Sequence, residues 1–127
     1  MANEISLTAK LSAAKGSTRV AIAPASDGSS SLTVNWTGNL YVAHRQSINH
    51  LAAVAIDLGQ CPVGGWGMFI NRDATNYIEL RQASGASDFC RLNAGEFAMF
   101  RLSPDMSAPF AIANTAACDL DYLIMES

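Results

Sequence analysis

Residues 66–81, WGMFINRDATNYIELR, decide the fold class predicted for this chain. Every second residue is apolar in both halves of the stretch, at positions 66, 68 and 70 and again at positions 78 and 80. A period of two is the pleat of a half-buried β-strand, and residues 72–76 between the halves contain Asp and Asn, which turn a chain by bonding to their own backbone. We therefore predict a β-hairpin with strands at 66–71 and 77–81.

The same pattern recurs at both ends of the chain. Residues 110–114 and 120–125 are apolar, and the small polar residues 115–119 separate them, so a second hairpin is expected there. Residues 4–14 alternate between aliphatic and polar side chains and predict one long strand with one buried face.

The remaining strands follow from short alternating runs between Gly, Pro, Asn and Asp. They are expected at 19–23, 30–36, 40–48, 54–58, 88–92 and 96–103. A helical turn around 50–54 is the one alternative to strand. About ten short strands without an amphipathic helix predict an all-β chain. We expect an antiparallel β-sandwich, of which a jelly roll is one form, folding as a single domain over residues 1–127. The pattern leaves the strand order open.

Several strands are apolar on both faces. In the strand at 96–103, Phe97 and Met99 are on one face and residues 98, 100 and 102 are on the other. In the last strand, Leu123 and Met125 are on the face opposite residues 120, 122 and 124. Phe69 is likewise on the face opposite residues 66, 68 and 70. One apolar face per strand suffices for a two-layer sandwich, so the second needs another cover. We expect a homo-oligomer or attachment to a larger assembly, with the chain's own loops as the alternative cover. The expected interface residues are Ile5, Leu7, Leu11, Phe69, Phe97, Met99, Leu123 and Met125.

The composition excludes some classes of partner. Charged residues are 15% of the chain, against about 25% in typical soluble domains. The net charge of -3 and the dispersed Lys and Arg residues disfavour nucleic-acid binding. No apolar run is long enough to span a membrane, and the N-terminus has no secretory apolar region, so synthesis in a cytoplasm is expected.

The residues that could carry chemistry are dispersed. Cys61, Cys90 and Cys118 lack the spacing of a zinc site and are expected as small buried side chains. His44 and His50 would lie on one side of an extended strand, but position 50 falls past a bend, so a solvated or core-satisfied pair is expected rather than a shared metal. Asp119 and Asp121 are expected on a hydrated strand face, with cation binding or acid–base work as the alternative. No nucleophile motif or phosphate loop occurs. We predict a protein that is not an enzyme and has no cofactor or metal.

Three aromatic residues allow a second class of function. Trp36, Tyr41 and Trp66 could form a platform on which a sugar ring stacks, as in a carbohydrate-binding module, and Tyr77 is a further candidate for stacking. Two of the three occur in regular alternation with aliphatic residues, which favours a place in the core instead.

The sequence resembles the small virion-associated proteins of tailed bacteriophages. The resemblance lies in FINRDATNYIEL (69–80), RLNAGEFAMFRL (91–102) and FAIANTAACDLDYLIME (110–126), so it covers roughly residues 66–126, and EISLTAKLSAAKG (4–16) is also typical of such proteins. It implies a β-sandwich that oligomerises, often as a trimer, and binds a shell or tail by surface complementarity. No catalytic residues are carried over.

The expected function is therefore that of a structural virion protein made in the host cytoplasm. Capsid decoration (cement) is the first expectation, with the major capsid protein or another virion protein as partner, and a tail, baseplate or head-fibre component is the second. The N-terminal strand at 4–14 is the expected docking element, because a terminal strand can add to the open sheet edge of a neighbour.

Overall fold

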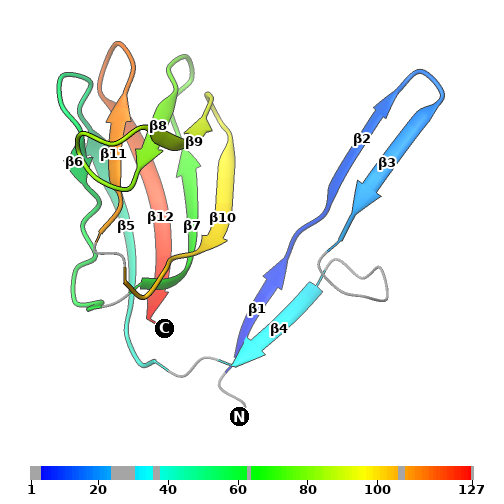
Figure 1. Cartoon of the computed structure of the whole chain (residues 1–127), viewed down its shortest axis with the longest axis horizontal. Coiled ribbons are helices and arrows are strands. Elements are labelled where there is room, and N and C mark those ends of the chain that lie inside the picture. The colour runs from blue at the N-terminus through cyan, green and yellow to red at the C-terminus, as the bar shows by residue number, and fades with distance from the viewer. Residues whose placement is uncertain (1–3, 24–30, 36–37, 63, 106–107, 127) are drawn as a thin grey trace. The chain divides into compact units, whose positions relative to one another are not determined.

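The computed structural model describes residues 4–23, 31–35, 38–62, 64–105 and 108–126, and the regular structure of these residues is entirely β (Figure 1). The chain divides into two compact units, Met1–Thr37 and Gly38–Ser127.

The second unit is an antiparallel β-sandwich. One sheet has the order β10 (Phe97–Arg101), β7 (Gly64–Asn71), β12 (Cys118–Glu126) and β5 (Tyr41–Ile48). The other has the order β6 (Val54–Ala55), β11 (Phe110–Ala113), β8 (Ile78–Arg81) and β9 (Asp88–Leu92). All neighbouring strands run antiparallel. The predicted all-β class and antiparallel sandwich are confirmed.

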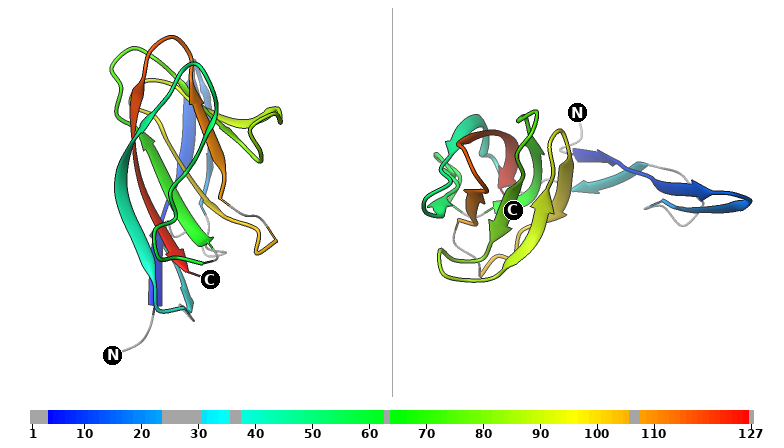
Figure 2. Two further views of the ribbon diagram at one scale, coloured as in Figure 1. Left: turned by 90° about the vertical axis from the view of Figure 1, so that its left-hand side faces the viewer. Right: turned by 90° about the horizontal axis from the view of Figure 1, so that it is seen from above.

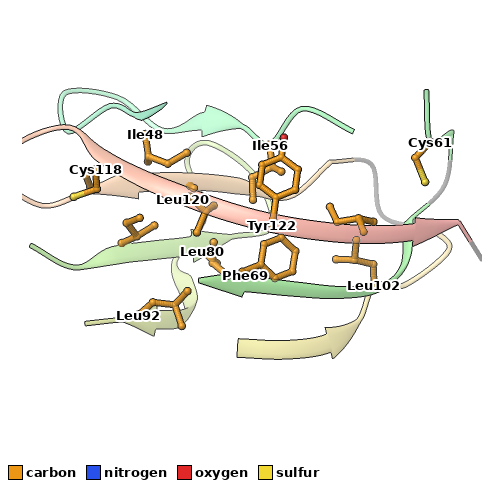
Figure 3. Packing of buried hydrophobic residues seen from close by; sticks show 14 residues of the cluster. Ile48, Ile56, Cys61, Phe69, Leu80, Leu92, Leu102, Cys118, Leu120 and Tyr122 are labelled. Atoms are coloured by element: carbon orange, nitrogen blue, oxygen red, sulfur yellow. The ribbon is translucent and has the colours of Figure 1, made fainter. Parts of the chain in front are cut away.

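The core lies between these two sheets and is almost entirely aliphatic and aromatic (Figure 3). The Phe69 ring stacks between Phe100 and Tyr122, at centroid distances of 5.1 and 6.3 Å. Gly67 leaves the space that the Phe69 ring needs, since a Cβ at position 67 would lie 2.9 Å from that ring. Phe89 packs edge-on against Phe100 at 5.6 Å and extends the row of rings from β9.

The predicted hairpins at 66–81 and 110–125 are wrong in their pairing, although their strands are right. β7 pairs with β10 and β12, whereas β8 pairs with β11 and β9, so the loop between them crosses from one sheet to the other. The last two strands, β11 and β12, likewise lie in different sheets. Alternation predicts which residues are strands, but it does not distinguish a hairpin from such a crossing loop.

A buried asparagine fixes the first crossing. Asn71 has no exposed surface, and its Nδ2 donates to the carbonyls of Asn76, Leu92 and Asn93 at 2.8–3.1 Å. Its Oδ1 accepts from the Asp73 backbone N–H at 2.9 Å. One side chain thereby holds together the loop after β7 and the loop after β9.

The second crossing is attached to the first. Asn114, directly after β11, exchanges two hydrogen bonds of 3.2 Å with the backbone of Tyr77. The Thr115 hydroxyl donates to Asn76 Oδ1 at 2.6 Å. The two loops therefore form one hydrogen-bonded end of the sandwich.

The first unit is a two-stranded ribbon, which we call the N-terminal ribbon. β1 (Glu4–Thr8) pairs with β4 (Ser31–Asn35), and β2 (Leu11–Lys15) pairs with β3 (Thr18–Ile22) around a turn at Gly16, whose φ is +59°. The expected single strand at 4–14 is interrupted at Ala9–Lys10. The expectation of one sandwich over residues 1–127 is also corrected, because in the described residues these strands pair only with one another.

Candidate interaction surfaces

The outer face of the sheet that contains β12 is apolar, and we call it the apolar sheet face. Its side chains point away from the buried residues that alternate with them on the same strands. They are Tyr41 and Ala43 from β5, Trp66, Met68 and Ile70 from β7, Phe97 and Met99 from β10, and Leu123 and Met125 from β12. Phe97 is 59% exposed, Leu123 43% and Tyr41 60%.

The strand register brings these side chains into rows. Met99, Met68, Leu123 and Ala43 are successive cross-strand partners, and they form an uncharged row across all four strands. The row beside it runs from Phe97 through Ile70 to Asp121 and Arg45, so it changes from apolar to charged. The apolar side chains are thus contiguous on β10 and β7, and contiguous apolar surface on a soluble protein marks an interaction site.

A shallow hollow of about 430 Å³ lies on this face. Ala43, Met68, Ile70 and Leu123 contribute to its lining, with Arg45 and Asp121 beside them. The hollow could accept an apolar side chain of a partner next to a charged pair.

The charged pair is part of a cluster centred on Asp121. The Asp121 carboxylate accepts from Arg45 Nε at 2.6 Å and Nη2 at 2.9 Å, and from Arg72 Nε at 2.8 Å. Hydrogen bonds from Arg45 and then Arg72 hold the pKa of Asp121 well below its usual range. The same carboxylate raises the pKa of Arg45. Asp121 is already paired within the protein, which makes it a poor general base.

The outer face of the second sheet is different. On β8, Glu79 and Arg81 lie opposite the buried Ile78 and Leu80. The Glu79 carboxylate pairs with Arg81 at 2.8 Å and with Arg91 at 3.1 Å, and the Arg91 guanidinium lies 4.1 Å from the centroid of the Tyr77 ring. Ion pairs therefore lie in the middle of this face, whereas on the apolar sheet face the ion pairs of Asp121 lie on the β12 and β5 side and the β10 and β7 side is apolar.

The N-terminal ribbon has apolar surface of its own. Leu11 and Ile22 are direct cross-strand partners and are 72% and 70% exposed. They line a hollow of about 290 Å³ together with Ala9, Lys10 and Ala23. In the other pair of strands Ile5 lies opposite Val34 and Leu7 opposite Leu32, while the alternating positions are polar.

Most of the predicted interface residues lie where the alternation places them. Phe97, Met99, Leu123 and Met125 are on the apolar sheet face, and Leu11 is exposed on the ribbon. Ile5 is half-buried and Leu7 is 8% exposed.

The prediction that Phe69 is an interface residue is wrong. It has no exposed surface and lies in the core, so Trp66, Met68 and Ile70 face outward in its place. Both faces of this strand are apolar, and the alternation alone therefore did not show which one is inside. The glycines at 65 and 67 are the signal that was missed, because small residues on one side of a strand indicate close packing there.

The residues considered for chemistry are not brought together. His44 packs edge-on against Tyr122 at 6.0 Å, and no group of three His, Cys, Asp or Glu side chains suited to a metal ion occurs in the described ranges. Asp119 is exposed on the face opposite the buried Leu120 and Tyr122, as predicted. Of the possible sugar platform, Tyr41 and Trp66 share the apolar sheet face, and Trp36 lies outside the described residues.

The cysteines fit their predicted role. Cys61 and Cys118 are buried and Cys90 is half-buried, and none of the three forms a disulfide. Burial raises the pKa of each thiol, which makes it a weak nucleophile at neutral pH.

The described part of the chain contains no helix that is long and apolar enough to cross a membrane. Comparison with family models, with curated proteins and with solved structures gave no match.

Proposed function

We propose that this chain is a non-enzymatic structural protein of a virion, a capsid decoration protein that stabilises the phage head as a homo-oligomer, with a trimer favoured. The observation that carries the proposal is the contrast between the two outer sheet faces. One carries the Glu79 ion pairs, and the other carries Trp66, Phe97 and three methionines beside the ion pairs of Asp121.

The contrast supports contact between proteins for an energetic reason. Fully burying one large apolar side chain contributes about 1.5–3 kcal/mol, and aromatic residues and Met are enriched at protein interfaces. A decoration protein acts by adding many such contacts across the joints of a shell, so that expansion or internal pressure must break them together. The resemblance of residues 66–126 to tailed-phage virion proteins supports the choice of a shell as the partner.

The N-terminal ribbon is the proposed attachment element. Its exposed Leu11 and Ile22 need cover, and an isolated two-stranded hairpin is at best marginally stable in water. Docking of the ribbon on another protein would supply both the cover and the stability.

The test uses heads of the encoding virus prepared without this protein. Full-length protein should co-sediment with the heads and raise the temperature at which they release DNA. Deletion of residues 2–14 should abolish co-sedimentation while near-UV circular dichroism keeps the signal of the folded sandwich. Unchanged occupancy after the deletion would exclude the ribbon as attachment element. Binding to purified tails but not to heads would replace decoration by a tail, baseplate or fibre role.

A carbohydrate-binding module is the second candidate, and one observation favours it. Tyr41 and Phe97 are each about 60% exposed on the same sheet face as Trp66, and exposed rings can stack on sugars. Glycan binding that is lost in Tyr41→Ala, in a protein that ignores heads, would favour this function over decoration.

A further inference from the structure

The chain carries two apolar surfaces, and the two units that bear them have formal charges of opposite sign. Residues 1–37 contain three basic and two acidic residues, whereas residues 38–127 contain five basic and nine acidic ones. The formal charges are therefore +1 and -4, which together give the -3 of the whole chain. Both lysines, Lys10 and Lys15, are in the ribbon. Opposite net charges favour contact of a ribbon with the sandwich of another copy over contact between two sandwiches.

Neither surface is large enough to form a stable interface alone. Four strands about 4.8 Å apart and five residues long, at about 3.4 Å per residue, give a footprint of about 330 Å². A two-stranded ribbon of about twelve residues in length gives about 400 Å² by the same spacings. A stable interface buries about 800 Å² per partner. A ribbon laid on a sheet face buries at most the smaller footprint, about 330 Å² on each side. A copy that both gives and receives a ribbon therefore buries about 660 Å², which is closer to this value than a single contact.

We propose that the apolar sheet face of each copy is covered by the N-terminal ribbon of a neighbouring copy, so that the subunits of the oligomer exchange ribbons. The inference rests on the self-association in the proposed function, but not on attachment to a capsid. The exposed pair Leu11 and Ile22 would lie over the hollow that Met68 and Leu123 line. Because every copy gives a ribbon and receives one, closing the ring makes each small contact intramolecular, and the contacts strengthen one another.

The proposal predicts which positions of two chains can be cross-linked. Leu11→Cys and Leu123→Cys are made in separate full-length chains, one of them labelled with ¹⁵N, and the two are mixed and allowed to exchange subunits. Mild oxidation should give a disulfide between position 11 of one chain and position 123 of the other, identified by mass spectrometry of the linked peptides. Thr33→Cys is the matched control, because Thr33 is exposed on the polar side of β4. The wild-type mixture gives the background from the native cysteines.

Each other linkage overturns the proposal in its own way. An 11–11 linkage would show ribbons paired with ribbons, and a 123–123 linkage would show two sheet faces in contact. A chain carrying both substitutions that closes on itself, with the native mass of a monomer, would show that each copy covers its own face.

A second measurement does not depend on cysteine chemistry. The double variant Leu11→Asp, Ile22→Asp should lose the oligomer and show the 13.4 kDa of one chain, whereas Thr33→Asp should keep the wild-type mass. An unchanged mass in the double variant would contradict ribbon exchange. Binding to heads is scored separately, so a monomer that still decorates heads would refute this inference and leave the proposed function standing.

Discussion

Replacement of Asn71 should destabilise the sandwich more than any surface change, because this residue connects two loops at one end of the fold. It is fully buried, and its amide donates to three carbonyls while its oxygen accepts from the Asp73 N–H. Asn71→Leu keeps the branched shape and the number of side-chain heavy atoms but removes both the donors and the acceptor. Asn71→Asp keeps the acceptor and turns a carboxylate toward the three carbonyl oxygens.

The magnitude follows from the hydrogen bonds that can form at once. The amide has two N–H bonds shared among three carbonyls and one oxygen in use, which makes three hydrogen bonds at about 1 kcal/mol each. Carbonyls left buried without a partner cost about 1–3 kcal/mol more. We expect Asn71→Leu to lower the free energy of unfolding by about 3–5 kcal/mol, a large part of the 5–15 kcal/mol typical of a domain. Asn71→Asp should be at least as harmful.

The assay is urea denaturation followed by tryptophan fluorescence, with Asn93→Ala as the matched control. Asn93 lies in the same loop, directly after β9, but its side chain is exposed. The control should change the free energy of unfolding by less than about 0.5 kcal/mol. A loss below about 1 kcal/mol in Asn71→Leu, with an unchanged m-value, would refute the view that this side chain holds the two loops together.

Three further changes test other parts of the structure. Gly67→Ala should cost about 1–3 kcal/mol of stability by thermal unfolding, because its Cβ would press on the Phe69 ring. Gly85→Ala, with open space around it, should be nearly neutral. Equal effects of the two changes would contradict the close packing of Gly67 against Phe69. Tyr122→Phe should cost about 1 kcal/mol, because the hydroxyl donates to the Asp57 carbonyl at 2.6 Å. Burial, and then the charge of Asp57, raises the pKa of Tyr122 to about 12, so the wild type should lose stability as pH rises from 10 toward 12. If the wild type and the phenylalanine variant lost the same stability over this pH range, this cause would be excluded. Asp121→Asn should remove part of the destabilisation seen in acid. A carboxyl with a lowered pKa stabilises the fold above its unfolded pKa of about 3.9 and loses that contribution as pH falls. Identical acid unfolding curves for the wild type and Asp121→Asn would contradict a role for the ion pairs with Arg45 and Arg72.

The strands were predictable because alternation is a local property. The interval 88–92 coincides with β9, and most other predicted strands agree with the structure within two residues. The strand predicted at 54–58 is shorter in the structure, because β6 ends at Ala55. There the Gln46 side chain donates to the Ala55 carbonyl and accepts from the Asp57 backbone N–H.

The pairing of strands was not predictable from the same signal. Whether residues 72–76 close a hairpin or cross between sheets depends on the bonds of Asn71 to Leu92 and Asn93, about twenty residues away. The inside of β7 depended in the same way on the space beside Gly67. Both are contacts between distant parts of the chain, and no local pattern encodes them.

The candidate surface was predicted in its principle and partly in its residues. Strands apolar on both faces indicated an interface, and four of the predicted residues lie on the apolar sheet face. Trp66, Met68 and Ile70 were assigned to the opposite side from the interface, because nothing in their own strand distinguishes them from Phe69. The separation of residues 1–37 as a unit was missed because their alternation matches that of the sandwich strands.

The central claim is that this chain works by covering its apolar surfaces with other protein. The most direct test is the native mass of the purified full-length chain by light scattering, compared with that of Phe97→Asp, Leu123→Asp. The wild type should be a stable oligomer of at least twice 13.4 kDa, and the double variant should be a folded monomer. A wild-type chain that stays monomeric at high concentration would contradict it.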